Sequence, residues 1–332
     1  MARARPAAPL TVFYPRGSTG SFGPSSRALR QPDLRFAGRH ALFPLAVRRS
    51  GADVYWSPAG LLPLGPLGMP AAITVHDLAI YRHPEWFPPG QWLSTRVVVP
   101  RSIRRAGAII AVSESTARDL KDLFGVERVS VVHHGVGSEF RPLHPSELGE
   151  IRGRLRLPDR FILFLSTIEP RKNLETLLDA WSGLPDAPQL VVAGGWGWRT
   201  EGIRAKLDSM ARRPQLLGPV APEDLPALYS AAVCLAHPAW YEGFGLTPLE
   251  AMACGTPVVC SNASSLPEVV GDAALTVDPG DGLALREALK RLTGDGELRA
   301  ELGRRGLERA AGYTWERAAE ATWRVLESLP AR

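Results

Sequence analysis

Two adjacent cations, Arg171 and Lys172, stand where a predicted strand gives way to a predicted helix. The run Phe161–Ser166 (FILFLS) is short and continuously apolar, which is typical of a buried parallel strand. Asn173–Trp181 (NLETLLDAW) then carries apolar residues at helical spacing. Because the amide dipole at a helix start already favours an anion, two cations at this point suit a diphosphate. The alternative is that both are exposed turn residues, as most Arg–Lys pairs are.

A carboxylate beside two glycines follows a second predicted strand. The segment Tyr241–Glu250 (YEGFGLTPLE) comes after the apolar run Val233–Ala236. Gly243 and Gly245 let backbone amides approach a ligand closely, because glycine has no β-carbon. Glu242, at the carboxyl end of the strand, is placed to accept hydrogen bonds from hydroxyl groups.

Glu250 has a structural explanation as well as a functional one. Thr247, then Pro248, then Glu250 three residues after the threonine form a favourable helix start: an N-cap, a first-turn proline and a capping-box carboxylate. Taken alone, this pattern favours the cap, and ligand binding by Glu250 is the alternative.

A histidine ends a predicted strand in the first half of the chain. His76 and Asp77 follow the apolar run Ala72–Val75. A histidine at the edge of a cleft can bind a sugar hydroxyl or stabilise charge at a reacting centre. A structural histidine is the alternative.

These residues must be positioned by strands that alternate with helices. The second half predicts further strands at Gln189–Ala193, Gln215–Leu217, Val258–Cys260 and Leu275–Val277, and helices at Glu201–Arg212, Glu223–Ser230 and Pro248–Cys254. Three more helices are predicted from about Gly282 to the end. Parallel neighbours need a crossover, so this alternation predicts a doubly wound parallel sheet, whose ligands bind beyond the carboxyl ends of the strands.

The first half shows the same alternation more faintly. Its candidate strands are Thr11–Tyr14, Val54–Trp56, Ala72–Val75, Ile109–Val112 and Val129–Val132. The segment His133–Pro145, rich in Gly, Pro and His, is predicted to link two lobes. A length of 332 residues also suits two α/β lobes. The cleft between them is the expected active site.

Composition narrows the class of protein. Three cysteines without metal-ligand spacing argue against a disulfide framework and a zinc site, and favour a reducing cytoplasm. The longest apolar stretch, Leu225–Ala236, is interrupted by Pro226 and is too short to cross a membrane.

The charge balance is mildly basic, with 39 Lys and Arg against 34 Asp and Glu. Arginines cluster at Arg96, Arg101, Arg104 and Arg105 and again between Arg152 and Arg160. Solvated helix faces are the first interpretation, and contact with anionic lipid at the inner face of a membrane, or with an anionic substrate, is the alternative. Nucleic acid is not expected, because basic residues do not alternate with aromatic ones.

Three long motifs together resemble glycosyltransferase family 4, whose members are retaining enzymes of the GT-B fold, and the bacterial mannosyltransferase-like branch in particular. They are EPRKN from Glu169, LGPVAPEDLPALYSAA from Leu217, and HPAWYEGFGLTPLEAMACGTPVVCSNASSLPEVVGDAALTVDP from His237. Shorter matches in the first half are VHDLAIYRHPEWFP from Val75, IIAVSESTARDL from Ile109 and VVHHGVGSEFRP from Val131. The resemblance extends from about Asp53 to Trp323, so the first lobe is expected to be shorter than a full one.

The resemblance implies roles for individual residues. Lys172, assisted by Arg171, binds the diphosphate of the donor, and Glu250 binds its ribose. Glu242 lies beside the transferred sugar, and His76 faces that sugar from the first lobe. Backbone amides contact the sugar and phosphates at Gly243, Phe244, Gly245, Leu246 and Thr247. Val220 packs near the base.

The expected protein is therefore a retaining hexosyltransferase, with mannose the first choice of sugar. Its donor is GDP-mannose or a UDP-sugar, its acceptor a glycan or lipid-linked saccharide, and no metal is expected because no acidic pair has metal-ligand spacing. Residues 1–140 form the acceptor-side lobe, 141–315 the donor lobe, and 316–332 a helix that crosses back. A sugar-nucleotide epimerase of the same fold and a donor-binding subunit without activity are the alternatives.

Overall fold

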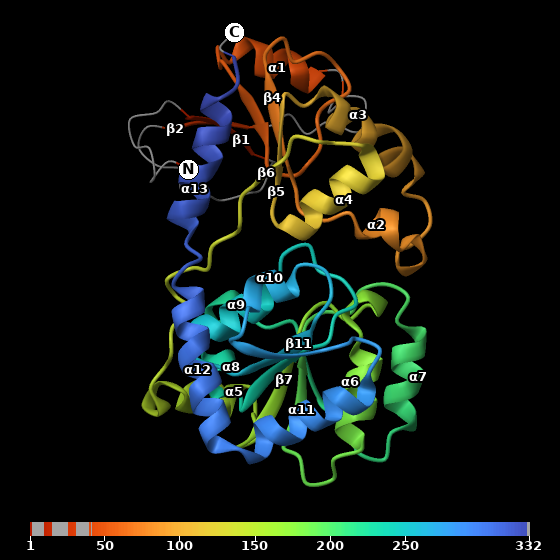
Figure 1. The fold of residues 1–332 in the computed structure, drawn as a ribbon, viewed down its shortest axis with the longest axis vertical. Coiled ribbons are helices and arrows are strands. Elements are labelled where there is room, and N and C mark those ends of the chain that lie inside the picture. The colour runs from red at the N-terminus through yellow and green to blue at the C-terminus, as the bar shows by residue number, and fades with distance from the viewer. Residues whose placement is uncertain (2–9, 15–25, 31–39, 41, 331–332) are drawn as a thin grey trace. The chain divides into compact units, whose positions relative to one another are not determined.

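The computed structural model describes Met1 and residues 10–14, 26–30, 40 and 42–330 (Figure 1). The chain divides into two compact units. The first consists of Met1–Tyr81, Pro89–Gly135 and Trp315–Arg332, and the second of Arg82–Pro88 and Val136–Thr314. The short segment Arg82–Pro88 lies within the predicted first lobe but packs with the second unit.

The second unit contains one parallel sheet of six strands in the order β12-β11-β10-β7-β8-β9. The strands are β7 (Phe161–Leu165), β8 (Gln189–Ala193), β9 (Gln215–Gly218), β10 (Cys234–His237), β11 (Val258–Ser261) and β12 (Ala274–Val277). Each lies within one residue of a predicted run. The chain order reverses between β7 and β10, and ligands of doubly wound sheets bind at such a switch point.

Helices on both faces bury this sheet. They are α5 (Gly149–Arg154), α6 (Leu174–Ser182), α7 (Glu201–Ser209), α8 (Leu225–Ala231), α9 (Leu246–Ala253), α10 (Leu266–Val270), α11 (Gly282–Gly294) and α12 (Gly296–Ala310). On one face, α6 packs against α11, and on the other α9 packs against α12. The apolar runs of the central strands are therefore covered from both sides, as their continuous hydrophobicity predicted.

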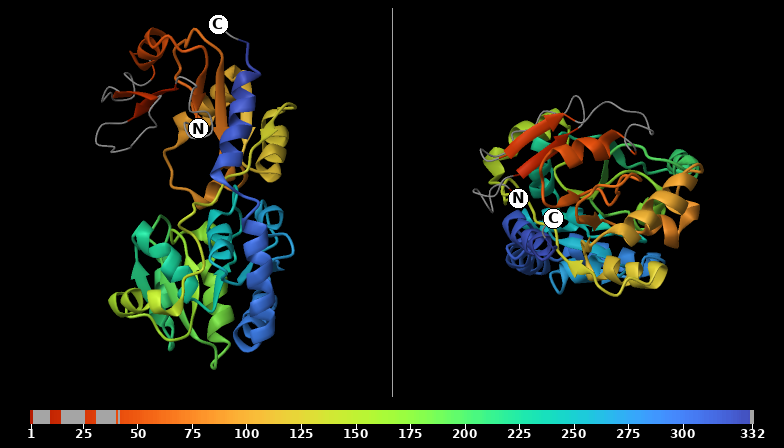
Figure 2. Two further views of the ribbon diagram at one scale, coloured as in Figure 1. Left: turned by 90° about the vertical axis from the view of Figure 1, so that its left-hand side faces the viewer. Right: turned by 90° about the horizontal axis from the view of Figure 1, so that it is seen from above.

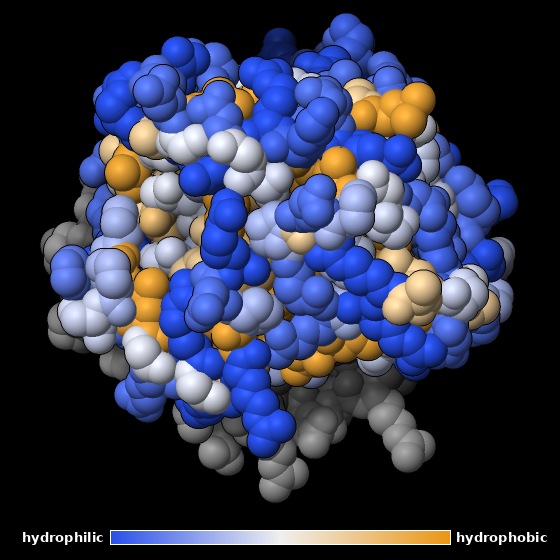
Figure 3. Space-filling view, turned by 90° about the horizontal axis from the view of Figure 1, so that it is seen from below, coloured by the Kyte–Doolittle hydropathy of each residue, from blue (hydrophilic) through white to orange (hydrophobic). Residues whose placement is uncertain are grey.

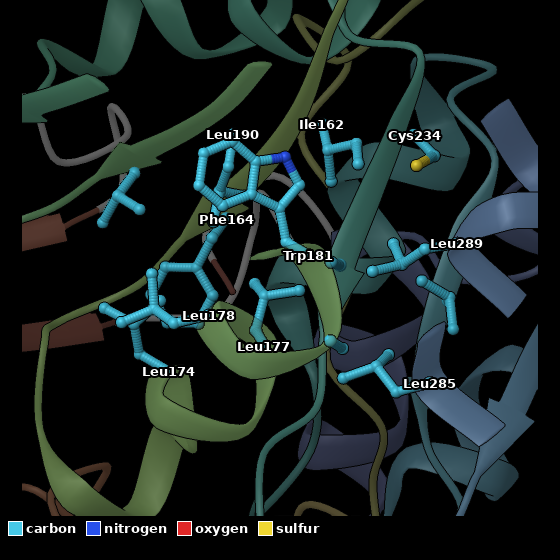
Figure 4. Packing of buried hydrophobic residues seen from close by; sticks show 14 of the residues in the cluster. Ile162, Phe164, Leu174, Leu177, Leu178, Trp181, Leu190, Cys234, Leu285 and Leu289 are labelled. Carbon is cyan, nitrogen blue, oxygen red and sulfur yellow. The ribbon is translucent and has the colours of Figure 1, made fainter. Parts of the chain in front are cut away.

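Trp181 of α6 is the largest side chain in the core of the second unit (Figure 4). It lies among Ile162 and Phe164 of β7 and Leu285 of α11, and its indole N–H donates a 2.9 Å hydrogen bond to the Pro188 carbonyl. Burying one such large apolar side chain contributes about 1.5 to 3 kcal/mol. This packing fixes α6, and with it the loop that precedes α6, against β7.

The first unit has a parallel sheet in the order β3-β4-β5-β6. Its strands are β3 (Tyr55–Ser57), β4 (Ala71–Val75), β5 (Ala108–Ala111) and β6 (Ser130–Val131), and its helices are α1 (Phe43–Arg49), α2 (Ala79–Arg82), α3 (Val99–Arg105), α4 (Glu114–Phe124) and α13 (Trp315–Glu327). A short helical turn lies at 94–98, and another, at 84–86, belongs to the segment Arg82–Pro88 of the second unit. Helix α13 contacts β5, so the end of the chain packs with residues of its first half (Figure 2).

A separate parallel pair lies near the N-terminus. Strand β1 (Leu10–Tyr14) pairs with β2 (Ser26–Arg30). Strand β2 and helix α1 lie between Pro15 and Ser50, where no element is predicted from the sequence because neither follows a clear apolar period. Residues 15–25 and 31–39 of that interval lie outside the described residues.

The face of the molecule in Figure 3 is mostly hydrophilic, with hydrophobic residues scattered singly or in small groups, as is usual for a surface in contact with water. All three cysteines are buried, and none of them forms a disulfide in the structure. Among the helices that the structure describes, none is long and apolar enough to cross a membrane.

Candidate functional site

The loops that follow β7 and β10 meet at the switch point of the sheet. After β7, a short 3₁₀ turn (Pro170–Lys172) leads to Asn173, which has φ of +57° and precedes α6. The Asn173 side-chain amide donates to the carbonyl oxygens of Pro238 (2.9 Å) and Pro279 (2.8 Å), which follow β10 and β12. The Trp240 N–H donates to the Arg171 carbonyl at 2.9 Å. Backbone and side-chain bonds thus join the loop that carries the two cations to the loop that carries Glu242.

Glu242 lies at the centre of a buried charge cluster. Its Oε1 contacts the Lys172 ammonium and accepts a 2.8 Å hydrogen bond from His237 Nε2. Its Oε2 lies 3.2 Å from Arg171 Nη1. The Glu242 side chain is 11% exposed and that of Lys172 equally so. The two cations are therefore not exposed turn residues, which decides against that alternative.

The electrostatics of the cluster keep Glu242 charged and His237 neutral. Burial by itself raises the pKa of Glu242, but the charge of Lys172, the hydrogen bond from His237 and the charge of Arg171 together place that pKa well below its usual range. Burial lowers the pKa of His237 despite the neighbouring carboxylate. A carboxylate only accepts hydrogen bonds, so His237 carries its proton on Nε2.

Two members of this cluster escaped the sequence analysis. Glu169 is 2% exposed, and its Oε1 lies 2.8 Å from Arg171 Nη2 and 3.0 Å from Arg171 Nε. His237 is 1% exposed and ends β10. Their common sequence signal is a polar residue directly before a proline: His237–Pro238 at the end of β10, and Glu169–Pro170 shortly after β7.

Helix α9 begins earlier than predicted. It starts at Leu246, after Gly245 with φ of +111°, and no side chain caps it. Thr247 lies inside the first turn, so the predicted capping box of Thr247 and Glu250 is wrong. Gly245 can adopt this positive φ because glycine has no β-carbon. The hydroxyl of Ser265 donates to the carbonyls of Glu242 (2.9 Å) and Phe244 (2.7 Å), which fixes the backbone ahead of the helix.

Without the capping role, Glu250 has another partner. The Tyr229 hydroxyl donates to Glu250 Oε2 at 2.7 Å. Burial raises the pKa of Glu250 to about 7, while this hydrogen bond lowers it. The side chain is partly buried in the second turn of α9.

The remaining donor-side candidates surround the same strand ends. Gly243 and Phe244 are buried between β10 and α9, and Leu246 is 37% exposed. Val220 is partly buried between β9 and the turn Pro222–Asp224. All of these residues belong to the second unit.

His76 belongs to the first unit. It follows β4 and is exposed, with Nε2 2.6 Å from the Pro58 carbonyl and Nδ1 3.3 Å from His134 Nε2. The two imidazole rings are stacked at 5.3 Å. His134, which the sequence analysis assigned to the linker, is thus a neighbour of the candidate histidine, and no sequence spacing predicted that contact.

The second unit can therefore bind an anion beside hydroxyl groups. Lys172 and Arg171 supply charged donors, the start of α9 supplies amides, and the two glutamates supply acceptors. Within the part of the chain that the structure describes, no group of three or more His, Cys, Asp or Glu side chains is arranged to bind a metal ion.

Both halves of the chain match models of glycosyltransferase families. Residues 150–309 match the model described as glycosyl transferases group 1, and residues 9–140 match glycosyltransferase family 4. The second match begins at residue 9, which corrects the predicted start at about Asp53. The signal before Asp53 is weak because the short run of β1 is not followed by a helical period.

Individual proteins support these matches. The O-antigen chain mannosyltransferase B of Escherichia coli is 35% identical over 261 residues, which cover 76% of this chain and 68% of the relative. Among solved structures, sucrose-phosphate synthase from Thermosynechococcus elongatus has a TM-score of 0.78 at 24% identity, covering 98% of this chain and 90% of that one. HepE of Anabaena, in complex with UDP and glucose, has a TM-score of 0.76 at 21% identity, covering 92% and 86%. The predicted fold is confirmed: two Rossmann-like lobes of the GT-B type.

Proposed function

The chain belongs to glycosyltransferase family 4, and we propose that it transfers mannose, with retention of configuration, from a nucleotide diphosphate sugar to a saccharide acceptor. One observation carries the proposal. Lys172, after β7, and Glu242, after β10, meet at the switch point of the donor-side sheet. A cation for phosphate and an acceptor for sugar hydroxyls are thereby neighbours, as a sugar diphosphate requires.

The diphosphate binds Lys172, Arg171 and the amides at the start of α9. Departure of the nucleoside diphosphate leaves negative charge on its distal phosphate. Fixed cations and helix amides stabilise that charge without reorganising, and such stabilisation usually contributes more to catalysis than any other single effect. Trp181 and Asn173 support this arrangement by fixing α6 and its preceding loop.

Hydroxyl groups of the donor bind the two glutamates. Glu250 accepts the ribose hydroxyls and Glu242 those of the transferred sugar, because an ionised carboxylate offers up to four acceptor positions. The base packs near Val220. For His76 we propose a hydrogen bond to a saccharide hydroxyl.

The chemistry proceeds without a metal ion. The cations Lys172 and Arg171 take the place that a divalent metal occupies in other phosphate sites. The acceptor hydroxyl attacks on the face that the leaving phosphate vacates, and that phosphate accepts the proton, so the anomeric configuration is retained.

The acceptor is a glycan or lipid-linked saccharide. The name of the Escherichia coli relative, an O-antigen chain mannosyltransferase, favours a growing polysaccharide and mannose as the sugar. The donor is GDP-mannose or a UDP-sugar. We assign the reaction to the cytoplasm, at or near the inner face of the membrane, where the exposed arginines of α3 suit anionic lipid.

The test is a transfer assay with GDP-mannose, UDP-glucose and a synthetic mannosyl acceptor that carries a lipid tail. We expect an extended product from one donor, with the anomeric configuration of that donor by NMR. Turnover should persist in excess EDTA. An epimerised sugar nucleotide would indicate an epimerase, and nucleotide binding without turnover would indicate a donor-binding subunit.

A further inference from the structure

The cations assigned to the diphosphate already have carboxylate partners. Lys172 contacts Glu242, and Arg171 lies between Glu242 (3.2 Å) and Glu169 (2.8 Å). Two positive and two negative side chains make up the cluster, and the fifth member, His237, is neutral because burial lowers its pKa. The cluster therefore has no net charge.

A balanced cluster is a poor site for an anion on its own. A free diphosphate must take Lys172 away from Glu242 or lie beside that carboxylate. Both alternatives are costly here, because ion–ion interactions between buried groups are weakly screened.

The sugar changes this balance. A sugar attached to the diphosphate brings hydroxyl groups that donate to a carboxylate, and such charge-assisted hydrogen bonds are strong. Glu242 then loses its ammonium partner and gains hydroxyl donors in the same event. The cost that Glu242 imposes on phosphate is offset only when the sugar is attached.

We propose that Glu242 makes the site select the sugar-linked nucleotide over the free nucleoside diphosphate, by competing with the diphosphate for Lys172 and Arg171. This inference rests on the proposed function, and it makes Glu242 a specificity-determining residue. After transfer, the sugar leaves, Glu242 recovers Lys172, and release of the nucleoside diphosphate becomes easier.

Glu242 also makes hydrogen bonds to two uncharged side chains. His237 Nε2 donates to Glu242 Oε1, and the backbone N–H of Glu242 donates to Ser264 Oγ at 2.7 Å. His237 is 1% exposed, and its Nδ1 is buried without a hydrogen-bond partner. Because this buried donor is neutral, the charged partners for which Glu242 and a ligand compete are Lys172 and Arg171.

The test compares wild type with Glu242→Gln by calorimetry, using GDP with GDP-mannose and UDP with UDP-glucose as paired probes. Glutamine keeps the shape and removes the charge. We expect Kd for the free nucleoside diphosphate to fall about tenfold, while the sugar-linked nucleotide loses most of its advantage. In a Lys172→Ala background, Glu242→Gln should produce a smaller gain, because only Arg171 of the two contested cations remains.

Glu175→Gln is the matched control. Glu175 is an exposed carboxylate in the first turn of α6, so its substitution makes the same charge change beside the same loop. It should leave both affinities within about twofold, as expected of a screened surface charge.

The outcomes separate the inference from the function on which it rests. Unchanged or weaker binding of the free nucleoside diphosphate to a folded Glu242→Gln protein overturns the inference and leaves the proposed function intact. If that variant does not fold, the affinities of the wild-type protein test the inference. Equal affinity for the free and the sugar-linked nucleotide of a pair overturns it, and tighter binding of the sugar-linked nucleotide supports it. Wild type that binds none of the four nucleotides overturns both.

Discussion

The Tyr229 hydroxyl donates a 2.7 Å hydrogen bond to Glu250 Oε2, and burial places the pKa of this carboxyl at about 7. Donor binding by the ionised form should therefore strengthen about tenfold between pH 6 and pH 8. Tyr229→Phe removes the hydrogen bond that lowers the pKa, so its binding midpoint should move to higher pH. Nucleotide titrations at several pH values measure both, and an identical midpoint in the two proteins would argue against this role of Tyr229.

Ionisation of the same carboxyl strengthens donor binding but lowers the stability of the folded protein. Folding favours the protonated form of Glu250. The stability gained from this preference is fully present below about pH 4.5 and is lost as the pH rises through about 7. Glu250→Gln should match wild type near pH 5 and melt at a higher temperature near pH 8. Its donor affinity should be about tenfold weaker at pH 8 and independent of pH.

How far the sequence predicts this protein depends on whether a feature is local or tertiary. The six strands of the donor-side sheet are continuous apolar runs bounded by turns, and all six were predicted to within one residue. Helix α9 shows the limit of local signals. The sequence Thr247-Pro248 is a favourable start, but the helix begins earlier, because Gly245 can adopt φ of +111° and the Ser265 hydroxyl fixes the backbone just before it.

Within the candidate site, residue types were predictable and partners were not. The pairing of Arg171 and Lys172 with Glu242 joins positions about 70 residues apart, and only the order of the strands brings them together. Glu169 and His237 were missed for a different reason. Their partners Arg171 and Glu242 lie only two and five residues away in the chain, but the local pattern does not predict that these polar side chains are buried.

Lys172→Ala should weaken binding of a nucleoside diphosphate by about 1.5 to 3 kcal/mol, the range for a charge-assisted hydrogen bond. The lower end is expected, since Lys172 exchanges one anionic partner for another when phosphate binds. Calorimetry with GDP and UDP measures the loss. A folded variant with wild-type affinity would exclude Lys172 from the site.

His134 predicts a loss of stability in mild acid. Burial, with smaller effects from His76 and His133, lowers its pKa from 6.5 to about 4. As the pH falls, the unfolded chain binds a proton at His134 near pH 6.5, whereas the folded protein does not bind it until about pH 4. The stability of the folded protein therefore falls across this interval. At pH 5 this amounts to about 1 to 2 kcal/mol.

Denaturant unfolding at pH 7.5 and pH 5 tests the assignment. His134→Gln should lose less free energy of unfolding between the two values than wild type does. His83→Gln is the control, because its side chain is 41% exposed. If both variants lose as much as wild type, the acid sensitivity arises elsewhere in the chain.

Substitution of two glycines with positive φ distinguishes a general backbone effect on stability from a specific effect on nucleotide binding. Gly125 ends α4 with φ of +66°, and a β-carbon there would meet no atom within 4 Å. Gly245 has φ of +111°, and its β-carbon would lie 2.9 Å from Leu266 Cδ2. Alanine tolerates the first conformation at a cost of about 1 kcal/mol, whereas the second lies outside the left-handed region that non-glycine residues use.

Gly125→Ala should therefore lower the free energy of unfolding by about 1 kcal/mol and leave nucleotide binding unchanged. Gly245→Ala should cost about 2 kcal/mol or more, since strain and a close contact add to the backbone effect. It should also weaken GDP or UDP binding at least severalfold, because the amides at the start of α9 can no longer keep their directions. Denaturant unfolding and calorimetry on both variants give the comparison. Equal nucleotide affinity in the two would mean that the phosphates do not bind the start of this helix, and Lys172 and Arg171 would then have to bind the diphosphate without it.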